Sequence, residues 1–195
     1  MEQVEELSAA RRGEAIDVLA TAFQDHPTMP ADPHGRRSHL MIVGLLDAFA
    51  GAPDATLFGI TREESLATVA FVYTDGYEPR GLKLVRFLWR MLRAIGFRMC
   101  RSMARVMSEK RTSDERRLEL MLLGTLGAYQ GQGMGRTMLR HLFEFARQRG
   151  YASVVLEAPK QTPAFELYLS EGFEVEKEIA LPMLTLCMMR RPLVK

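Results

Sequence analysis

The most constraining feature of this sequence is the stretch 118–145, in which three different patterns follow one another. It begins with a largely apolar run, 118–126, whose one charged residue is Glu119. A glycine-dense segment, 127–135, comes next, and after it apolar residues recur at three- and four-residue steps. Such spacing is typical of an amphipathic helix. The order therefore predicts a buried strand, a glycine loop and a helix.

A strand, a glycine loop and a helix in this order direct backbone N–H groups toward one spot. The first N–H groups of a helix lack intrahelical partners, and the helix dipole favours negative charge at that end. Glycine lets a ligand approach the backbone closely because it carries no Cβ. We therefore interpret 130–136 as a loop that binds phosphate.

The glycine spacing excludes the two common nucleotide motifs. A dinucleotide fingerprint GxGxxG that begins at Gly131 needs a glycine where the chain has Arg136. A P-loop, GxxxxGK followed by Ser or Thr, that ends at Thr137 needs a glycine in place of Gln130 and a lysine in place of Arg136. The phosphate must therefore belong to another kind of ligand.

Two segments in this half of the chain resemble motifs of one family. The pattern Gln130-x-x-Gly133-x-Gly135 resembles the pyrophosphate-binding motif of the GNAT superfamily of acetyl-CoA-dependent N-acetyltransferases. Residues 164–173, AFELYLSEGF, resemble the AxxxYxxxGF segment of the same family, a short helix that runs into a strand. The two motifs stand in the expected order and separation, and the resemblance extends from 115 to the C-terminus.

The resemblance implies acetyl-CoA as cosubstrate. It places the pyrophosphate on the backbone amides of 130–136, with Arg136 as a further phosphate partner, and pairs the pantetheine arm with 125–127. Gln161 stands where the family often has an asparagine that contacts the cofactor, and Pro163 stiffens the start of the next helix. The implied cofactor-binding residues are Thr125, Leu126, Gly127, Gln130, Gly131, Gln132, Gly133, Met134, Gly135, Arg136, Gln161 and Phe165.

Tyr168 is the candidate general acid. Acetyl transfer to an amine needs a base for the amine and a proton for the leaving thiolate. Tyr168 occupies the tyrosine position of the second motif, and the resemblance implies that its phenol protonates the thiolate. The alternative is a tyrosine that packs against the cofactor without proton transfer.

Glu119 is the candidate general base, acting directly or through water. Several members of the family carry a glutamate at a similar distance before the glycine loop. Alternation along the strand predicts that Glu119 shares a face with Met121 and Leu123. The alternative is an exposed carboxylate near the start of the strand that pairs with Arg116 or Arg117.

Composition fits one globular domain that spans 1–195, with 47% apolar and 26% charged residues. The two cysteines, Cys100 and Cys187, have no metal-site spacing, and the four histidines form no ligand cluster, so we expect no metal. The N-terminal segment lacks the apolar core of a signal peptide, and no uncharged apolar run approaches the ~18 residues of a membrane span. Two thiols suit a reducing compartment, so we expect a cytoplasmic protein.

Positive charge is concentrated in 80–111, which holds ten basic residues and one acidic residue, although the whole chain carries only +2. Apolar and basic residues alternate there at helical spacing, with a break at Gly96, and Arg98, Arg101 and Arg105 continue a basic stripe beyond it. Three interpretations stay open: a solvated basic face over a core-facing stripe, a lid over the acceptor pocket, or a surface for anionic lipid or nucleic acid. A general polyanion binder should be basic more widely, so no specific nucleic acid is expected.

Periodicity and turn residues place the other elements. Strands are expected at 3–7, 56–61, 65–73, 118–126, 152–158, 173–180 and 184–189. Helices are expected from an N-cap at Ser8 to about Asp25, at 35–50, in two segments within 80–110, after the glycine loop and at 164–170. These elements and the resemblance imply an α/β fold with a mixed, mostly antiparallel central sheet, helices on both faces and a helical insertion before the central strand.

The family resemblance, together with the two motifs that carry it, implies an N-acetyltransferase that moves the acetyl group of acetyl-CoA to a primary amine by direct attack in a ternary complex. A small-molecule acceptor is favoured over a protein, but the sequence does not identify it. Two alternatives stay open: a non-catalytic module of the same fold that binds or senses acyl-CoA, and a peripheral membrane or nucleic-acid binder that works through 80–111. Chains of this superfamily often pair, so a homodimer is compatible with the resemblance.

Overall fold

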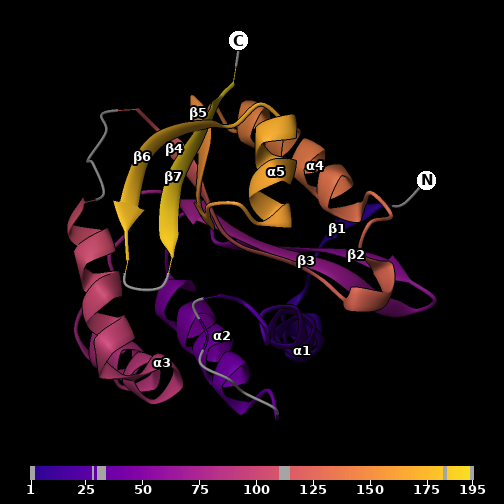
Figure 1. The fold of residues 1–195 in the computed structure, drawn as a ribbon. Coiled ribbons are helices and arrows are strands. Elements are labelled where there is room, and N and C mark those ends of the chain that lie inside the picture. Colours follow the sequence, from indigo (N-terminus) through magenta and orange to yellow (C-terminus); the bar gives the residue numbers. More distant parts are fainter. Residues whose placement is uncertain (1–2, 28, 30–33, 110–114, 182–183, 194–195) are drawn as a thin grey trace.

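The computed structural model describes residues 3–27, 29, 34–109, 115–181 and 184–193, and within them it shows seven strands and five α-helices (Figure 1). The strands are β1 Val4–Glu6, β2 Thr56–Arg62, β3 Ser65–Thr74, β4 Arg117–Thr125, β5 Ser153–Pro159, β6 Glu174–Ala180 and β7 Thr185–Pro192. The helices are α1 Arg12–Ala22, α2 Arg36–Phe49, α3 Leu82–Glu109, α4 Met134–Gln148 and α5 Pro163–Ser170, with short 3-10 turns η1 Ala9–Arg11 and η2 Gly127–Tyr129.

All seven strands form one open sheet in the order β1-β2-β3-β4-β5-β7-β6. Neighbouring strands are antiparallel except β4 and β5, which are parallel. The parallel pair is joined by α4, which crosses over from the end of β4 to the start of β5. The predicted α/β fold with a mixed, mostly antiparallel sheet is therefore confirmed.

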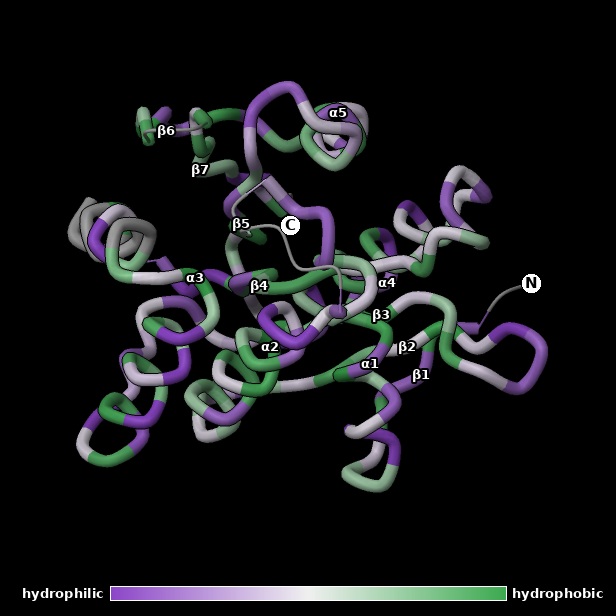
Figure 2. The backbone as a smooth tube through the Cα atoms, turned by 60° about the horizontal axis from the view of Figure 1, so that its bottom comes forward, coloured by the Kyte–Doolittle hydropathy of each residue, from purple (hydrophilic) through white to green (hydrophobic). Residues whose placement is uncertain are grey.

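Helices cover both faces of the sheet, as predicted. α4 and α5 lie on one face and α1 and α2 on the other, and a separate apolar cluster fills each layer. Figure 2 shows hydrophobic segments of β3 and β4 between these helical layers. α3, the predicted insertion, lies beside α2, and its buried Val106 packs with Ile179 of β6 and Leu186 of β7.

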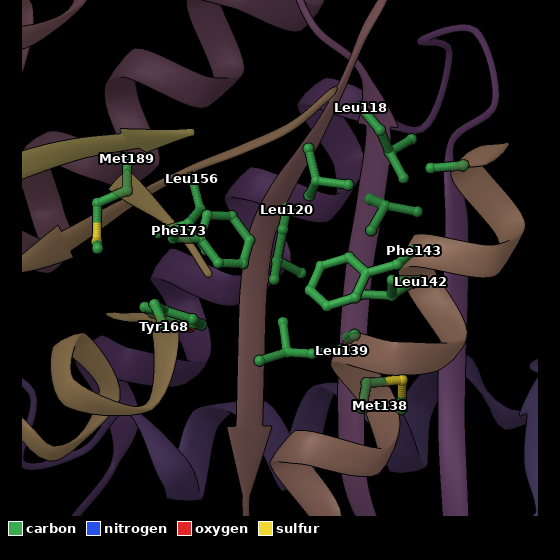
Figure 3. Packing of buried hydrophobic residues seen from close by; sticks show 14 of the residues in the cluster. Leu118, Leu120, Met138, Leu139, Leu142, Phe143, Leu156, Tyr168, Phe173 and Met189 are labelled. Atoms are coloured by element: carbon green, nitrogen blue, oxygen red, sulfur yellow. The ribbon is translucent and has the colours of Figure 1, made fainter. Parts of the chain in front are cut away.

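The packing of α4 on β4 sets the position of the helix. Met138, Leu139, Leu142 and Phe143 form one buried stripe of α4 and share a cluster with Leu120 of β4 (Figure 3). Full burial of a side chain of this size contributes about 1.5–3 kcal/mol to folding. The apolar residues that recur at the predicted helical spacing therefore form the core face of α4. Their packing holds the start of the helix beside the end of β4.

A β-bulge interrupts β4 at Met121. Val72 of β3 pairs with Leu120 and Phe71 pairs with Leu122, so Met121 has no partner in the β3 register. One extra residue moves the following side chains to the other face of the sheet. Leu123 consequently packs toward α4, whereas Met121 packs toward α1 and α2. The prediction that Glu119 shares a face with both Met121 and Leu123 is correct for Met121 and wrong for Leu123.

The two central strands β4 and β5 part at this bulge. The parallel register of β4 and β5 ends with Leu120 opposite Leu156, although both strands continue beyond that point. Gly124 lies beyond this irregularity and pairs regularly with Val69 of β3. A Cβ on Gly124 would lie 2.9 Å from the Cβ of Ala22, so glycine is needed there to let α1 pack on the sheet.

The local expectations for α1 and α3 have different outcomes. α1 ends at Ala22 rather than near Asp25, and Ser8 precedes η1 without a capping hydrogen bond from its side chain. The break at Gly96 is confirmed, because this residue has φ 77° and ψ 167° inside α3. Beyond it Arg101 is exposed, whereas the side chains of the other two predicted stripe residues, Arg98 and Arg105, lie outside the described residues.

Candidate active site

The glycine loop adopts backbone angles that favour glycine at two positions. Gly131 has φ 75° and Gly133 has φ 88°, in the left-handed region that costs other L-residues about 1–2 kcal/mol. A Cβ on either residue would meet no atom within 4 Å. Glycine is thus required by the backbone angle, and the space beside the loop is open to a ligand.

The first turn of α4 presents unpaired backbone donors to that space. Gly133 is the N-cap residue and provides no side-chain acceptor, and the turn contains no acidic residue. The helical bonding begins with the Thr137 amide, which donates to the Gly133 carbonyl at 3.0 Å. The amides of Met134, Gly135 and Arg136 precede this bond, so they are free of the helical ladder. The helix dipole makes this end favourable for an anion.

Gly135 of the first sequence motif lies against α5, the helix that carries the second motif. A Cβ on Gly135 would lie 3.2 Å from Cδ2 of Leu167 on α5, so the glycine permits close contact between α4 and α5. Met134, by contrast, has its side chain buried in the core, where Sδ lies 3.5 Å from the Thr68 hydroxyl. Both residues can therefore serve an anion only through their backbone amides.

The polar side chains of the loop make contacts within the protein. Gln130 donates from Nε2 to the Thr125 carbonyl at 3.0 Å, and Gln132 donates from Nε2 to the Ala128 carbonyl at 3.0 Å. The Arg136 guanidinium pairs with Glu171 at 2.6 Å. The predicted phosphate partner Arg136 is therefore held toward the end of α5 in this structure.

The end of β4 is tied to β3. The Thr125 hydroxyl lies 3.0 Å from the Thr68 hydroxyl, and the Leu126 amide donates to the Ala67 carbonyl at 2.9 Å. Gly127 follows as the first residue of η2. The predicted contact segment 125–127 thus stands beside the gap between β4 and β5, with its Leu126 amide already engaged by β3.

Glu119 is buried near the centre of the sheet, with 5% of its surface exposed. It lies opposite Tyr73 of β3 and Val155 of β5, on the face covered by α1 and α2. The interpretation of Glu119 as an exposed carboxylate is therefore wrong. Arg117 forms an ion pair with Asp75 at 2.5 Å, and Arg116 forms one with Asp54 at 2.8 Å.

Tyr168 is buried on the opposite face, in the layer of α4 and α5 (Figure 3). Its ring meets Phe173 edge-on with 5.6 Å between the ring centroids. Burial raises the pKa of Tyr168, so the phenol keeps its proton at neutral pH. The two candidate catalytic groups therefore lie on opposite faces of the sheet, separated by the strands β4 and β5.

The loop before α5 and the first turn of α5 hold the remaining two predicted cofactor residues, Gln161 and Phe165. Gln161 has φ 61°, a left-handed conformation in which asparagine and glycine are better tolerated than glutamine. Thr162 is the N-cap of α5, and its hydroxyl accepts a hydrogen bond from the Phe165 amide at 3.2 Å. The Phe165 side chain is buried in the core beside Tyr168. Phe165 consequently supports the layer that holds the candidate acid.

Sequence reasoning missed Thr68 and Tyr73 of β3. Thr68 is fully buried and contacts both Thr125 and Met134, whereas Tyr73 stands opposite Glu119. Both positions depend on the register between β3 and β4. The apolar alternation of β3 predicts a strand, but it does not say which residue of β4 faces which residue of β3.

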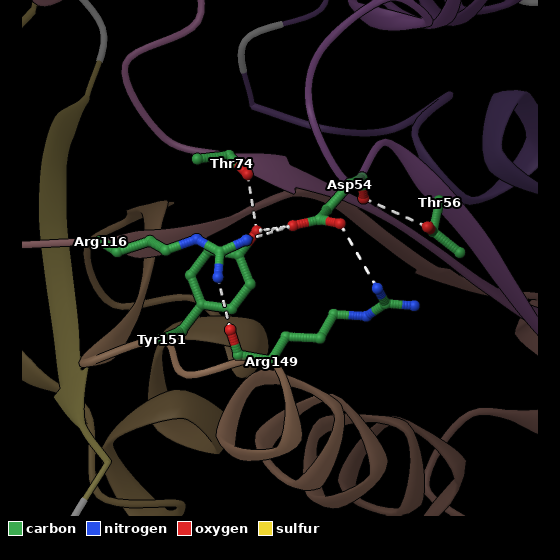
Figure 4. Close-up of polar contacts among 6 residues, drawn as sticks. All are labelled: Asp54, Thr56, Thr74, Arg116, Arg149 and Tyr151. Carbon is green, nitrogen blue, oxygen red and sulfur yellow. Dashed lines mark hydrogen bonds and ion pairs between the residues drawn. The ribbon is translucent and has the colours of Figure 1, made fainter.

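A polar network secures the far end of α4, away from the glycine loop (Figure 4). The Tyr151 hydroxyl donates to Asp54 at 2.5 Å and lies 2.6 Å from the Thr74 hydroxyl. Arg116 pairs with the same carboxylate and lies over the Tyr151 ring, and Arg149 pairs with it at 3.4 Å. These contacts join the start of β2, the end of β3 and the start of β5.

In the part of the chain that the structure describes, no three His, Cys, Asp or Glu side chains gather to hold a metal ion, and Cys100 and Cys187 carry free thiols. Over the same ranges, no helix combines the length and apolar character that crossing a membrane requires.

The candidate site thus combines an open mixed sheet, a bulged central strand and a helix N-terminus preceded by glycines, which lies beside a gap between parallel strands. The Acetyltransferase (GNAT) family model matches residues 53–173 of this chain. The match covers more than half of the sequence, and the chain belongs to the GNAT family.

Individual relatives agree with this assignment over shorter stretches or at lower identity. The chain is 38% identical over 63 residues to N-acetyltransferase 8F1 of Rattus norvegicus, an alignment that covers 32% of this chain and 28% of the relative. It therefore matches less than a third of that relative's length. A solved structure described as histone acetyltransferase HPA2 and related acetyltransferase of Corynebacterium glutamicum superposes with a TM-score of 0.72 at 20% identity, covering 100% of this chain and 98% of that one. Arylalkylamine N-acetyltransferase 2 of Aedes aegypti superposes with a TM-score of 0.70 at 15% identity, covering 98% and 99%. These two likenesses show the fold.

Proposed function

We propose that this chain is an N-acetyltransferase that transfers the acetyl group of acetyl-CoA to a primary amine of a small molecule, by direct attack in a ternary complex. The observation that carries the proposal is the open first turn of α4. Its uncapped amides follow two glycines in the left-handed region and lie beside the point where β4 and β5 part. Membership of the GNAT family supports acetyl-CoA as the anionic ligand.

The residues present fit the pyrophosphate group of acetyl-CoA. The amides of 134–136 would hold it, because they stand before the first helical hydrogen bond and face open space beside Gly131 and Gly133. Arg136 would add a charge-assisted contact after exchanging Glu171 for phosphate. When bound, acetyl-CoA supplies an activated acetyl thioester to the amine.

Glu119 and Tyr168 are suited to complementary proton transfers. We assign Glu119 the role of accepting a proton from the amine, directly or through water, as the N–C bond forms. We assign Tyr168 the role of giving its proton to the thiolate as the C–S bond breaks. Glu119 and Tyr168 lie on opposite faces of the sheet. This placement supports separate roles for the two residues, because the gap between β4 and β5 after Leu120 is bordered by both helical layers.

The burial of Glu119 supports a slender acceptor. Its cross-strand neighbour Tyr73 packs against Phe49 of α2, with 4.8 Å between the ring centroids, so α2 covers this face. α3 extends the cover from α2 to β6 and β7, which favours the interpretation of the insertion as a lid. A small amine can reach a carboxylate in such a layer more easily than a folded protein can. We further propose a reducing, cytoplasmic setting, because both described cysteines are free.

The test separates binding from chemistry. Thiol release is measured with acetyl-CoA and a panel of primary amines for the wild type, Glu119→Gln and Tyr168→Phe, and acetyl-CoA affinity is measured by calorimetry for the same three proteins. We expect turnover to fall about 100-fold or more in each variant with little change in affinity. Unchanged turnover in both variants would remove the two catalytic assignments.

The alternative function is a non-catalytic module that binds or senses acyl-CoA. The raised pKa of Tyr168 favours it in one respect, because a weaker acid protonates a thiolate less readily. Saturable acetyl-CoA binding by the wild type without thiol release for any amine of the panel would support this alternative.

A further inference from the structure

Exposed apolar side chains are concentrated on the first part of α3. Among the described residues, seven of the nine large hydrophobic side chains that are exposed belong to this helix. They are Leu82, Leu84, Val85, Leu88, Trp89, Leu92 and Phe97. The most accessible, Phe97, Leu82 and Val85, are 72%, 70% and 65% exposed. The concentration on one element distinguishes α3 from the rest of the surface, where single exposed apolar residues need no explanation.

Most of these residues form one continuous stripe along the helix. With successive residues about 100° apart, Leu82, Val85, Leu88, Trp89 and Leu92 fall within an arc of about 120°. We call these five residues the outer stripe. The core-facing side of the helix lies elsewhere on its circumference, since Met91, Ala94 and Ile95 are buried in the cluster shared with α2. α3 therefore has a second apolar face in addition to the one that packs on the protein.

The contact with α2 holds this second face outward. A Cβ on Gly44 of α2 would lie 3.1 Å from Cε of Met91, so glycine allows the two helices to pack closely. Asp47 of α2 accepts hydrogen bonds from Arg90 of α3 and from Arg12 of α1. These bonds fix the rotation of α3 and leave the outer stripe facing solvent.

Positive charge borders the outer stripe. Residues 80–97 include five Lys or Arg and no Asp or Glu. Of these, Lys83, Arg86 and Arg93 are exposed and follow the outer stripe on the helical circumference. The Arg93 guanidinium lies 4.6 Å from the centroid of the Trp89 ring. The exposed surface of α3 thus combines apolar side chains, an aromatic ring with a polar edge, and cationic side chains.

We propose that the outer stripe docks α3 onto the surface of a bilayer that contains anionic lipids. The apolar side chains would enter the boundary between headgroups and acyl chains, and Lys83, Arg86 and Arg93 would face the lipid phosphates and carboxylates. Charge complementarity favours this occupant, because an interface with a second copy would bring like charges together. A nucleic acid fits this surface less well, because its phosphate backbone offers no apolar group to the five side chains of the outer stripe.

Such docking leaves the glycine loop accessible. α3 belongs to the layer of α2, whereas the first turn of α4 lies on the other side of the sheet (Figures 1 and 2). The bilayer would therefore lie against the side of the protein away from the glycine loop. The outer stripe contains none of the residues assigned to cofactor or catalysis, so vesicle binding and acetyl transfer can be measured separately.

The test is binding of the full chain to vesicles of phosphatidylcholine with phosphatidylserine, and to vesicles of phosphatidylcholine alone. Trp89 is the single tryptophan of the sequence, so its emission reports directly on the outer stripe. We expect cosedimentation with the anionic vesicles, a blue shift of Trp89 emission, and weaker binding at high salt. Failure of the wild type to bind anionic vesicles would overturn the proposal.

Two variants identify the surface involved. Val85→Glu combined with Leu88→Glu should lower vesicle partitioning about tenfold or more, because two apolar side chains are replaced by anions. Val175→Glu, at a position of β6 that is 37% exposed, is the matched control and should bind like the wild type. Equal binding by the double variant would overturn the proposal. Self-association of the wild type in sedimentation equilibrium that the double variant abolishes, without vesicle binding, would assign the outer stripe to a second copy instead.

Discussion

The side-chain amide of Gln130 donates a 3.0 Å hydrogen bond to the backbone carbonyl of Thr125. Gln130 is the first residue of the glycine motif, and Thr125 is the last residue of β4. The bond therefore ties the phosphate-binding loop to the strand that borders the gap, and it sets the position of Gly131 and Gly133 relative to the candidate active site.

Replacement of Gln130 tests this connection. We expect Gln130→Ala to weaken acetyl-CoA binding about fivefold, which corresponds to the roughly 1 kcal/mol net contribution of one hydrogen bond. Calorimetric titration provides the measurement. Gln148→Ala is the matched control, because Gln148 bonds Glu144 at the far end of α4. Equal affinities of the two variants would show that the bond does not organise the loop.

Gln161 is strained in a way that suggests a stabilising substitution. Its φ of 61° lies in the left-handed region, which asparagine tolerates better than glutamine does. We expect Gln161→Asn to raise the free energy of unfolding by about 0.5–1 kcal/mol. Urea denaturation measures this change. A loss of stability would instead indicate that the glutamine side chain makes a contact that outweighs the strain.

His26 makes the fold sensitive to mild acid. Burial lowers its pKa from 6.5 to about 4, and its ring lies 5.1 Å from the ring of Phe23. The unfolded chain then binds more protons than the folded one between these pH values. The folded protein is therefore fully stable with respect to His26 above pH 6.5, and it loses free energy of unfolding as the pH falls toward 4.

This effect can be measured as a difference between variants. From pH 7 to pH 4 we expect His26 to account for a loss of about 1–3 kcal/mol of stability, which should be absent in His26→Gln. The comparison uses thermal or urea unfolding at several pH values. An identical pH dependence in the two proteins would contradict the lowered pKa, as would a titration of the His26 ring near pH 6.5 by NMR.

The Tyr151 hydroxyl serves stability rather than the site. It bonds Asp54 at 2.5 Å and approaches Thr74 at 2.6 Å, at the end of α4 that lies away from the glycine loop. Tyr151→Phe removes both contacts but keeps the ring on which Arg116 lies. We expect a loss of about 1–2 kcal/mol in unfolding free energy with unchanged acetyl-CoA affinity. A weaker affinity would show that the network also controls the position of the first turn of α4.

Local periodicity predicted most of the elements that form the candidate site. The apolar steps of α4 were visible because each of them faces one core, and glycine marks the positive φ angles at Gly131 and Gly133. The break at Gly96 has the same origin. These features depend only on residues that are close together in the chain, so the local sequence is enough to predict them.

Other features depend on contacts between distant segments. The bulge at Met121 arises from the pairing of β4 with β3, and simple alternation therefore assigned Leu123 to the wrong face. The pairing of Arg136 with Glu171 joins two motifs through the packing of α4 on α5. The sequence shows Glu119 only as the single charge of an apolar strand. Its burial depends on the layer of α1 and α2 that covers β4.

Calorimetric titration with acetyl-CoA tests the central claim most directly, with ATP and NAD as control ligands and with Gly133→Ala as a variant. The Cβ of an alanine at position 133 would meet open space, but the native φ of 88° is unfavourable for an L-residue. The substitution should therefore disturb only the backbone at the start of α4. We predict saturable binding of acetyl-CoA alone, weakened about tenfold in Gly133→Ala and unchanged in Gly13→Ala, a helical glycine of α1 with no atom within 4 Å of a Cβ. No binding of acetyl-CoA, or equal binding by both variants, would contradict the assignment of the α4 N-terminus as the cofactor site.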